Sequence, residues 1–308
     1  MSVEQALNAL RQFDVEAATL SVWTLKKRQS KAGRFKAQSV VATGELIEEF
    51  KDIASARIDK CAEVDDYDLI TQINESSCLF LEADETLFPQ MQDVVDQPPE
   101  EHLIDDFSDL QGSLGYVARF AHGDDVLYCV CKLPGDWQVK KRKQRINLVL
   151  RENRLDLADD ETFAISKTFD FFVLNGDILV VNRANFESLL EYKQTYISSF
   201  AQLQADATFQ GVFSDMALLI QHVGTNTMHL RRMAVVQQRA YYSDANFMAK
   251  LQAVNLTRNW KIDFDANGKI VPSPDSVRTI IQVLLNHRLH SEMTGDDFDV
   301  PSASPVAK

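Results

Sequence analysis

The sequence predicts an α+β protein, with a strand-rich mixed N-terminal part containing antiparallel hairpins and a mainly helical C-terminal part containing a small β-hairpin. Up to residue 182, apolar runs of strand length alternate with short turns. Beyond it, apolar side chains recur at helical spacing, and an Asp-Ala-Asn-Gly turn at 265–268 marks the small hairpin. We therefore expect a strand-rich domain at 1–182, a mainly helical domain packed on it at 183–295 and a flexible tail at 296–308.

The clearest single prediction is a hairpin between residues 169 and 182. Two apolar runs, 169–174 and 177–182, flank Asn175-Gly176, the residue pair typical of a two-residue type I′ turn. This turn sets Phe171 opposite Val180 and makes both faces of the hairpin apolar. Strands with two apolar faces are typical of the interior of a covered sheet, so we expect this hairpin in the core.

A helix should follow this hairpin with almost no connection. Asn182 is the expected N-cap, and Val181 and Phe186 take the positions of a hydrophobic staple. Apolar side chains continue at helical spacing as far as Leu203. The pattern predicts one long helix that covers the sheet.

The remaining elements are assigned from the same two periodicities. Further strands are expected at 17–25, 35–41, 77–81, 113–122 and 125–133, and residues 146–150 are expected to return to the sheet. Helices are expected at 4–13, 43–58, 87–95, 209–223, 228–242, 246–254 and 273–285.

Composition places the chain among ordinary globular proteins, with 45% hydrophobic and 25% charged residues. No apolar stretch approaches the roughly 20 residues that span a bilayer, and the first residues do not form a secretory signal. We therefore expect a cytoplasmic protein with reduced cysteines. Cys129 and Cys131 are expected as buried thiols, because their spacing is not that of a zinc site.

Charge is distributed unevenly along the chain. The net charge of −13 argues against indiscriminate binding to nucleic acid or anionic lipid. Residues 137–154 nevertheless contain seven basic residues and one acid, whereas residues 82–110 contain ten acids and no Lys or Arg. The acid-rich stretch is expected to be a mobile surface segment or a crossing between domains; mimicry of nucleic acid and covering of a basic groove are alternatives to a simply solvated stretch.

Three groups of cations are the candidate binding residues. Lys and Arg side chains bind phosphates without reading sequence, and their binding depends on salt. The candidates are Lys140, Lys141, Arg142, Lys143 and Arg145 in the basic run, Lys26, Lys27 and Arg28 near a hairpin tip, and Arg231 and Arg232, supported by Arg239, on a helix. An acidic protein partner, an anionic membrane surface and a merely solvated face remain alternatives.

No recognised catalytic motif is found. The sequence lacks a Walker A loop, a Gly-x-Gly-x-x-Gly turn, a Gly-x-Ser-x-Gly elbow and a His-Glu-x-x-His pair. Glu191-Tyr192-Lys193 superficially resembles the Glu-x-Lys of metal-dependent nucleases, but it is expected on the outer face of a helix. The pairs His222/His229 and His287/His290 lack the flanking carboxylates that favour a metal site. We expect no enzyme activity, no cofactor and no metal.

Two segments are similar to a known family. The run 167–191, with its Phe-Asp-Phe hairpin and Val-Asn-Arg-Ala-Asn-Phe-Glu sequence, resembles the KwaB-like family of the bacterial Kiwa antiphage defence system, and residues 284–295 resemble that family's closing segment. The resemblance implies a cytosolic protein that works with a membrane-embedded subunit (KwaA-like), engages phage DNA and forms a homodimer or larger assembly.

The resulting hypothesis is a non-enzymatic defence effector. It would bind double-stranded phage DNA through its basic surface and be recruited to the inner face of the cell membrane through its partner. A protein-partner or membrane-docking adaptor without direct DNA binding is the alternative, and a metal-dependent nuclease is a third hypothesis.

Overall fold

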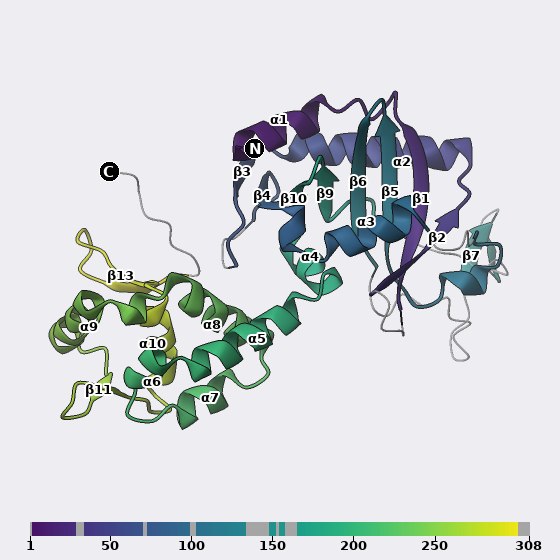
Figure 1. The fold of residues 1–308 in the computed structure, drawn as a ribbon. Helices are drawn as coiled ribbons and strands as arrows, with labels where there is room; N and C mark the ends of the chain where they lie inside the picture. The colour runs from purple at the N-terminus through teal and green to yellow at the C-terminus, as the bar shows by residue number, and fades with distance from the viewer. Residues whose placement is uncertain are drawn as a thin grey trace. The chain divides into compact units, whose positions relative to one another are not determined.

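A computed structural model describes residues 2–28, 34–69, 73–98, 103–133, 148–151, 154–157 and 165–300. Its contacts divide the chain into two units. Unit 1 comprises Met1–Tyr67 and Ile73–Leu190, and unit 2 comprises Asp68–Gln72 and Glu191–Lys308. Unit 1 holds the large sheet and unit 2 is mainly helical with small hairpins, which confirms the predicted α+β class (Figure 1). The expected domain boundary after residue 182 stays a prediction.

Unit 1 is built on a mixed sheet whose order, among the described residues, is β2-β1-β5-β6-β9-β10-β4-β3. Figure 1 shows this order across the unit, with β2 at one edge and β3 at the other. Neighbouring strands are antiparallel, except that β3 and β4 are parallel. The strands are β1 (Thr19–Lys27), β2 (Phe35–Val40), β3 (Glu63–Asp66), β4 (Ser77–Glu82), β5 (Ser113–His122), β6 (Asp125–Lys132), β9 (Phe171–Leu174) and β10 (Asp177–Val180).

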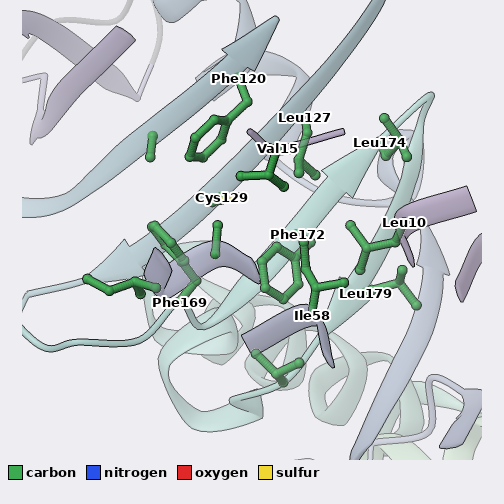
Figure 2. Close-up of a cluster of buried hydrophobic side chains, with 14 of the residues drawn as sticks. Leu10, Val15, Ile58, Phe120, Leu127, Cys129, Phe169, Phe172, Leu174 and Leu179 are labelled. Carbon is green, nitrogen blue, oxygen red and sulfur yellow. The ribbon is translucent and has the colours of Figure 1, made fainter. Parts of the chain in front are cut away.

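Helices cover both faces of this sheet. α1 (Val3–Gln12) and α2 (Gly44–Lys60) lie on one face, and α3 (Phe88–Asp96) and α4 (Arg183–Leu189) lie on the other (Figure 1). Short 3₁₀ turns occur at η1 (Ala83–Glu85) and η2 (Phe107–Leu110). Figure 2 shows the core under α1 and α2, where Leu10 and Ile58 of the helices pack against Phe172 and Leu179 of the sheet.

The central hairpin forms as predicted. Phe171 pairs with Val180, and Phe172 pairs with Leu179. Asn175 and Gly176 both have positive φ, 53° and 85°, as a type I′ turn requires. Every side chain of β9 is buried, and β6 and β4 flank the hairpin. The sequence therefore identified the centre of the sheet.

The helix after the hairpin differs from expectation. Asn182 caps α4, since its side chain accepts a hydrogen bond from the Asn185 N–H at 3.2 Å. α4 then ends at Leu189, Glu191 adopts a left-handed φ of 57°, and α5 (Tyr192–Ala205) begins in unit 2. The prediction of one long covering helix is wrong, because the apolar spacing continues across a break in the backbone.

Unit 2 contains further helices around its own core, which includes Tyr196, Met233 and Ile280. The segment expected as one helix at 209–223 forms two, separated by a bridge from Phe213 to Ile270. The helices are α6 (Ala207–Gly211), α7 (Ala217–Val223), α8 (Thr227–Arg239), η3 (Tyr241–Ser243), α9 (Ala245–Arg258) and α10 (Val277–Leu284). The expected small hairpin is β11 (Asp263–Phe264) with β12 (Ile270–Val271).

Two short strands depart from the sequence predictions. Asp297–Asp299, expected in the tail, forms β14 and pairs with β13 (Arg288–His290), because Gly295 with φ 75° allows the chain to turn back. β7 (Leu148–Arg151) pairs with β8 (Arg154–Leu157), which follows it directly, in a separate two-stranded sheet rather than in the large one. Residues 301–308 lie outside the described residues.

Candidate functional site

The β1–β2 hairpin gathers five cations at one end, which we call the cationic end: Lys26, Lys27, Arg28, Arg34 and Lys36. Lys26 lies directly opposite Lys36, and Lys27 lies opposite Phe35. The pairing continues past the strands, because the Arg28 N–H donates to the Arg34 carbonyl at 2.9 Å. The two chain segments therefore hold these side chains in register up to residues 28 and 34.

The cations of this end are mostly in contact with water. Lys27, Arg28, Arg34 and Lys36 are exposed, whereas Lys26 is half-buried. Burial lowers the pKa of the Lys26 ammonium group, Asp109 offsets part of this shift, and the charge of Lys36 adds to it. Like charges placed opposite one another on neighbouring strands repel, so an added anion would relieve the Lys26–Lys36 pair. This chemistry suits a phosphate or carboxylate ligand.

The chain leaves the large sheet at Leu133, ahead of the basic run, and returns to it at Asp170. At the departure, the Leu133 N–H donates to the Leu114 carbonyl at 2.8 Å. At the return, Asp170 donates its N–H to the Val130 carbonyl at 2.8 Å and accepts the Lys132 N–H on Oδ2 at 2.6 Å. Leu133 and Asp170, which flank the basic run in the chain and which we call its roots, therefore lie at the ends of neighbouring strands.

The cationic end and these roots lie at the same end of the sheet. Leu25 of β1 pairs with Gly115 of β5, which in turn pairs with Lys132 of β6. A Cβ on Gly115 would lie 2.6 Å from the Cys131 carbonyl oxygen, so glycine permits the close approach of β5 and β6 here. Only β5 separates the strand that leads to the cationic end from the strand that leads to the basic run.

Part of the acid-rich stretch lies beside the same hairpin. Leu103 forms a parallel bridge with Ser39 of the edge strand β2, and the Ile104 N–H donates to the Ser39 carbonyl at 2.9 Å. Asp109 interacts electrostatically with Lys26. The stretch therefore runs beside β2, and its Asp109 offsets part of the pKa shift of Lys26.

The other predicted cations fall into two groups. The basic-run residues Lys140, Lys141, Arg142, Lys143 and Arg145 lie outside the described residues. In unit 2, Arg231 lies over the Tyr196 ring at 5.7 Å and Arg232 is half-buried. Arg239 binds the Leu285 carbonyl at 3.1 Å and Asp68 Oδ2 at 3.0 Å, so it holds the unit together. The structure brings Lys26, Lys27 and Arg28 together, and a ligand role for each predicted cation stays a prediction.

The histidines that invited a metal interpretation have protein partners. The His222 and His229 rings stack with centroids 4.6 Å apart, and burial lowers the pKa of His222. His287 is buried, and its Nε2 lies 3.2 Å from Arg239 Nη1. His290 Nδ1 lies 3.0 Å from Asp297 Oδ1. In the part of the chain that the structure describes, no group of three or more His, Cys, Asp or Glu residues converges as metal ligands would.

Arg34 belongs to the basic connection that the sequence places at the hairpin tip, whereas sequence reasoning missed Lys36 as a member of the cationic end. The hairpin register would have found Lys36, because pairing around the 26–36 connection sets it opposite Lys26. No local signal in the sequence shows that the cationic end lies near the roots of the basic run. This proximity arises because β5, which is far from β1 in the chain, pairs with β1 on one side and with β6 on the other.

Comparison with known proteins identifies a family. A family model described as Kiwa protein KwaB-like matches residues 110–294. No curated protein and no solved structure matches the chain. The matched range contains the central hairpin, the basic run and most of unit 2.

Proposed function

Because the chain belongs to the Kiwa KwaB-like family and is thereby a component of an antiphage defence system, we propose that it binds double-stranded phage DNA through the sheet end described above. Binding would be non-enzymatic and independent of sequence, with Lys and Arg side chains on backbone phosphates. The bound protein would impede use of the invading genome.

The observation that best supports this proposal is a pairing across three adjacent strands. Leu25 of β1 pairs with Gly115 of β5, and Gly115 pairs with Lys132 of β6. It sets the cationic end and the roots of the basic run at one end of the sheet, within a molecule whose net charge is −13. An acidic protein that gathers cations locally attracts a polyanion at that place and repels it elsewhere. A duplex with two phosphate backbones offers such a ligand to both segments.

The test is a titration of fluorescent duplex DNA against salt, read by anisotropy. The variant K26E/K27E/R28E should lose affinity about tenfold or more at low salt, equally for unrelated sequences. The slope of log K against log salt should become shallower by about 0.9 for each phosphate that the variant no longer neutralises. A matched control, K60E/K193E/K250E, makes the same change in charge at exposed lysines distant in the sequence and should bind nearly normally.

A second variant, in which Lys140, Lys141, Arg142 and Lys143 are all changed to Glu, tests the basic run. If both segments hold one duplex, each variant should bind DNA more weakly than wild type. The variant that combines both sets of changes should bind no more tightly than the weaker-binding of the two separate variants. Equal affinity of the control and the K26E/K27E/R28E variant would remove the cationic end from the proposal. Unchanged binding by the basic-run variant would remove that segment.

We also propose that the protein has no nuclease activity. Glu191 is the glutamate of the segment that superficially resembles the Glu-x-Lys of nucleases. It was expected on the outer face of a helix, but it lies at the left-handed break before α5. Incubation with supercoiled plasmid and magnesium or manganese should leave the plasmid intact. Cleavage that survives repurification and is lost on changing Glu191 would establish the nuclease hypothesis instead.

The proposal includes a membrane-embedded partner subunit, cytoplasmic location and assembly as a homodimer or larger oligomer. Among the described helices, none is long and apolar enough to cross a bilayer. Coexpression with the membrane subunit should shift the protein into the membrane fraction, and expression without it should not. Sedimentation would give the number of copies.

The adaptor alternative uses the same cations for anionic lipid or for acidic loops of a partner. Flotation with vesicles of phosphatidylglycerol and phosphatidylethanolamine separates the two functions. Vesicle binding that is lost in the K26E/K27E/R28E variant, together with no DNA binding at low salt, would replace the DNA proposal with the adaptor.

A further inference from the structure

Three side chains that can donate hydrogen bonds form a row across β2, β1 and β5. Lys36 lies directly opposite Lys26, and Lys26 lies opposite Ser113. Side chains opposite one another on antiparallel strands point to the same face of the sheet, with Cβ atoms about 5 Å apart. Lys36 is exposed, Lys26 is half-buried and Ser113 is 7% exposed. The row therefore runs from the sheet edge, where it meets water, toward the interior.

A register shift gives Ser113 its place in this row. Leu25 pairs with Gly115, so regular pairing would set Leu114 opposite Lys26, but Ser113 takes that position. Such an extra residue is a β-bulge, which redirects side chains and is common beside functional sites. The bulge thus sets a hydroxyl group opposite Lys26 where regular pairing would set an apolar side chain.

Polar groups on this face lack hydrogen-bond partners. Ser113 Oγ is buried and forms no hydrogen bond among the described residues. Gln38, which is 7% exposed, likewise has a buried Oε1 without a partner in the described part of the chain. It follows Lys36 by two residues on β2, so the two side chains share a face. Because buried polar groups in folded proteins nearly always have partners, this face is suited to a polar ligand.

The approach to the row is open at the start of β5. Gly112, which precedes Ser113, is exposed, and a Cβ on it would meet no atom within 4 Å. Lys36 is exposed at the other end of the row. Between them lies the half-buried Lys26, whose four-carbon side chain is flexible. A small group can therefore reach the Ser113 hydroxyl when this lysine side chain moves aside.

The chemistry of the row selects a phosphomonoester. Its two ammonium groups and one hydroxyl group can each donate to a different oxygen of one ligand. A phosphomonoester carries about two negative charges near neutral pH and has three terminal oxygens. A phosphodiester inside a DNA strand carries about one charge and has only two such oxygens. The monoester therefore matches both the charge and the number of donors.

We propose that Lys26, Lys36 and Ser113 form a binding site for a phosphomonoester, as found at the 5′ end of a DNA strand. The inference rests on the proposed DNA binding, because it gives the cationic end a preference for phosphorylated DNA ends. Each ammonium group pairs with one phosphate oxygen, and Ser113 Oγ donates to the third. Inorganic phosphate offers the same dianion from a second source.

The test compares two blunt duplexes that differ only in having 5′-phosphate or 5′-hydroxyl ends, with binding read by anisotropy. Wild type should bind the phosphorylated duplex about tenfold more tightly. S113A should lose this preference and bind the hydroxyl-ended duplex as wild type does. It should also fold normally, because the hydroxyl has no partner to lose among the described residues. The matched control S21A changes another serine of this part of the sheet, on β1, and should keep the preference.

Competition by inorganic phosphate separates the two sources. Displacement of the phosphorylated duplex, but not of the hydroxyl-ended one, would show that the site also takes the free dianion. An end preference without such competition would make the DNA end the ligand.

Two results would overturn the proposal. One is equal affinity of wild type for both duplexes, which would leave general DNA binding intact. The other is an end preference that S113A retains. If neither duplex binds, the DNA proposal fails, and thermal unfolding with inorganic phosphate decides on the site alone. Stabilisation of wild type but not of S113A would keep the site, and no stabilisation would remove it.

Discussion

The large sheet contains two antiparallel hairpins, β9–β10 and β1–β2, whose side chains lie in opposite environments. β9–β10 lies between β6 and β4, and the side chains of its strands are buried except for the half-buried Asp177. β1–β2 reaches the sheet edge, where Lys26 faces Lys36. A charge in the centre would lose its hydration, whereas the edge leaves it in water. Position in the sheet therefore separates the residues that hold the fold from those available to a ligand.

The largest expected effect is at the centre. Phe172 is 0% exposed and contacts the Phe169 ring at 6.2 Å between centroids. We expect F172A to lower the free energy of unfolding by about 3–5 kcal/mol, because the deletion leaves a cavity that neighbours fill only in part. Urea unfolding followed by circular dichroism would measure this loss.

Matched valines control for side-chain size in that comparison. V180A removes two methyl groups from a fully buried site on β10, and V40A removes them from a half-buried site on β2. The central variant should lose more stability than the edge variant. Equal losses would mean that the edge hairpin is as important to the fold as the central one, and the contrast would fail.

A smaller effect is expected where the central hairpin begins. Asp170 is 1% exposed and accepts hydrogen bonds from the Lys132 N–H at 2.6 Å and the Asn185 side-chain amide at 2.8 Å. D170A should cost about 1–3 kcal/mol, because both buried donors lose their acceptor. The same measurement by urea unfolding applies, and a loss below that of V40A would contradict the assignment.

The pH dependence of this variant has a definite sign. Burial raises the pKa of Asp170 above its ordinary value of 3.8, against the hydrogen bonds from Lys132 and Asn185. The folded state thus binds its proton more tightly than the unfolded state, so this contribution to stability is complete below pH 3.8 and is lost as pH rises through the raised pKa. The stability difference between wild type and D170A should shrink over that interval. A difference that grows would show a lowered pKa instead.

The smallest effect concerns the edge and should have the opposite sign. K36E places a carboxylate opposite Lys26, replacing a like-charge pair with an attractive one. We expect a gain of about 0.2–1 kcal/mol in unfolding free energy, together with weaker DNA binding. Thermal unfolding and anisotropy on one sample would measure both. A variant that is stabilised and binds DNA normally would separate Lys36 from the proposed interface.

Local signals in the sequence predicted the parts of the fold that short-range physics determines. Asn175-Gly176 fixed the turn and the register of β9 with β10, and Asn182 marked the start of α4. The break at Glu191 was missed because Phe186 and Phe200, on either side of it, are buried in different units while keeping helical spacing. The spacing of apolar residues indicates a helical period, but it does not show where a single residue with a left-handed backbone interrupts the helix.

Long-range pairing explains the rest of what sequence could not predict. The basic composition near residues 26 and 140 is visible in the chain, but the row that brings the corresponding strands to one sheet end requires Gly115 to pair with both Leu25 and Lys132. Likewise, Cys61 and Cys78, far apart in the chain, share one core only because α2 packs on the sheet. Residue type suggested candidate chemistry, and topology decided which candidates meet.

The membership of Asp68 in unit 2 has a consequence for dissecting the molecule. Asp68 forms an ion pair with Arg239 at 3.0 Å, and Leu69 packs against the core of unit 2, although both residues come between two strands of unit 1. The chain therefore passes from one unit to the other three times. A single cut after Leu190 would leave the helical fragment without a piece of its own interior, so unit 2 cannot be obtained whole by simple truncation.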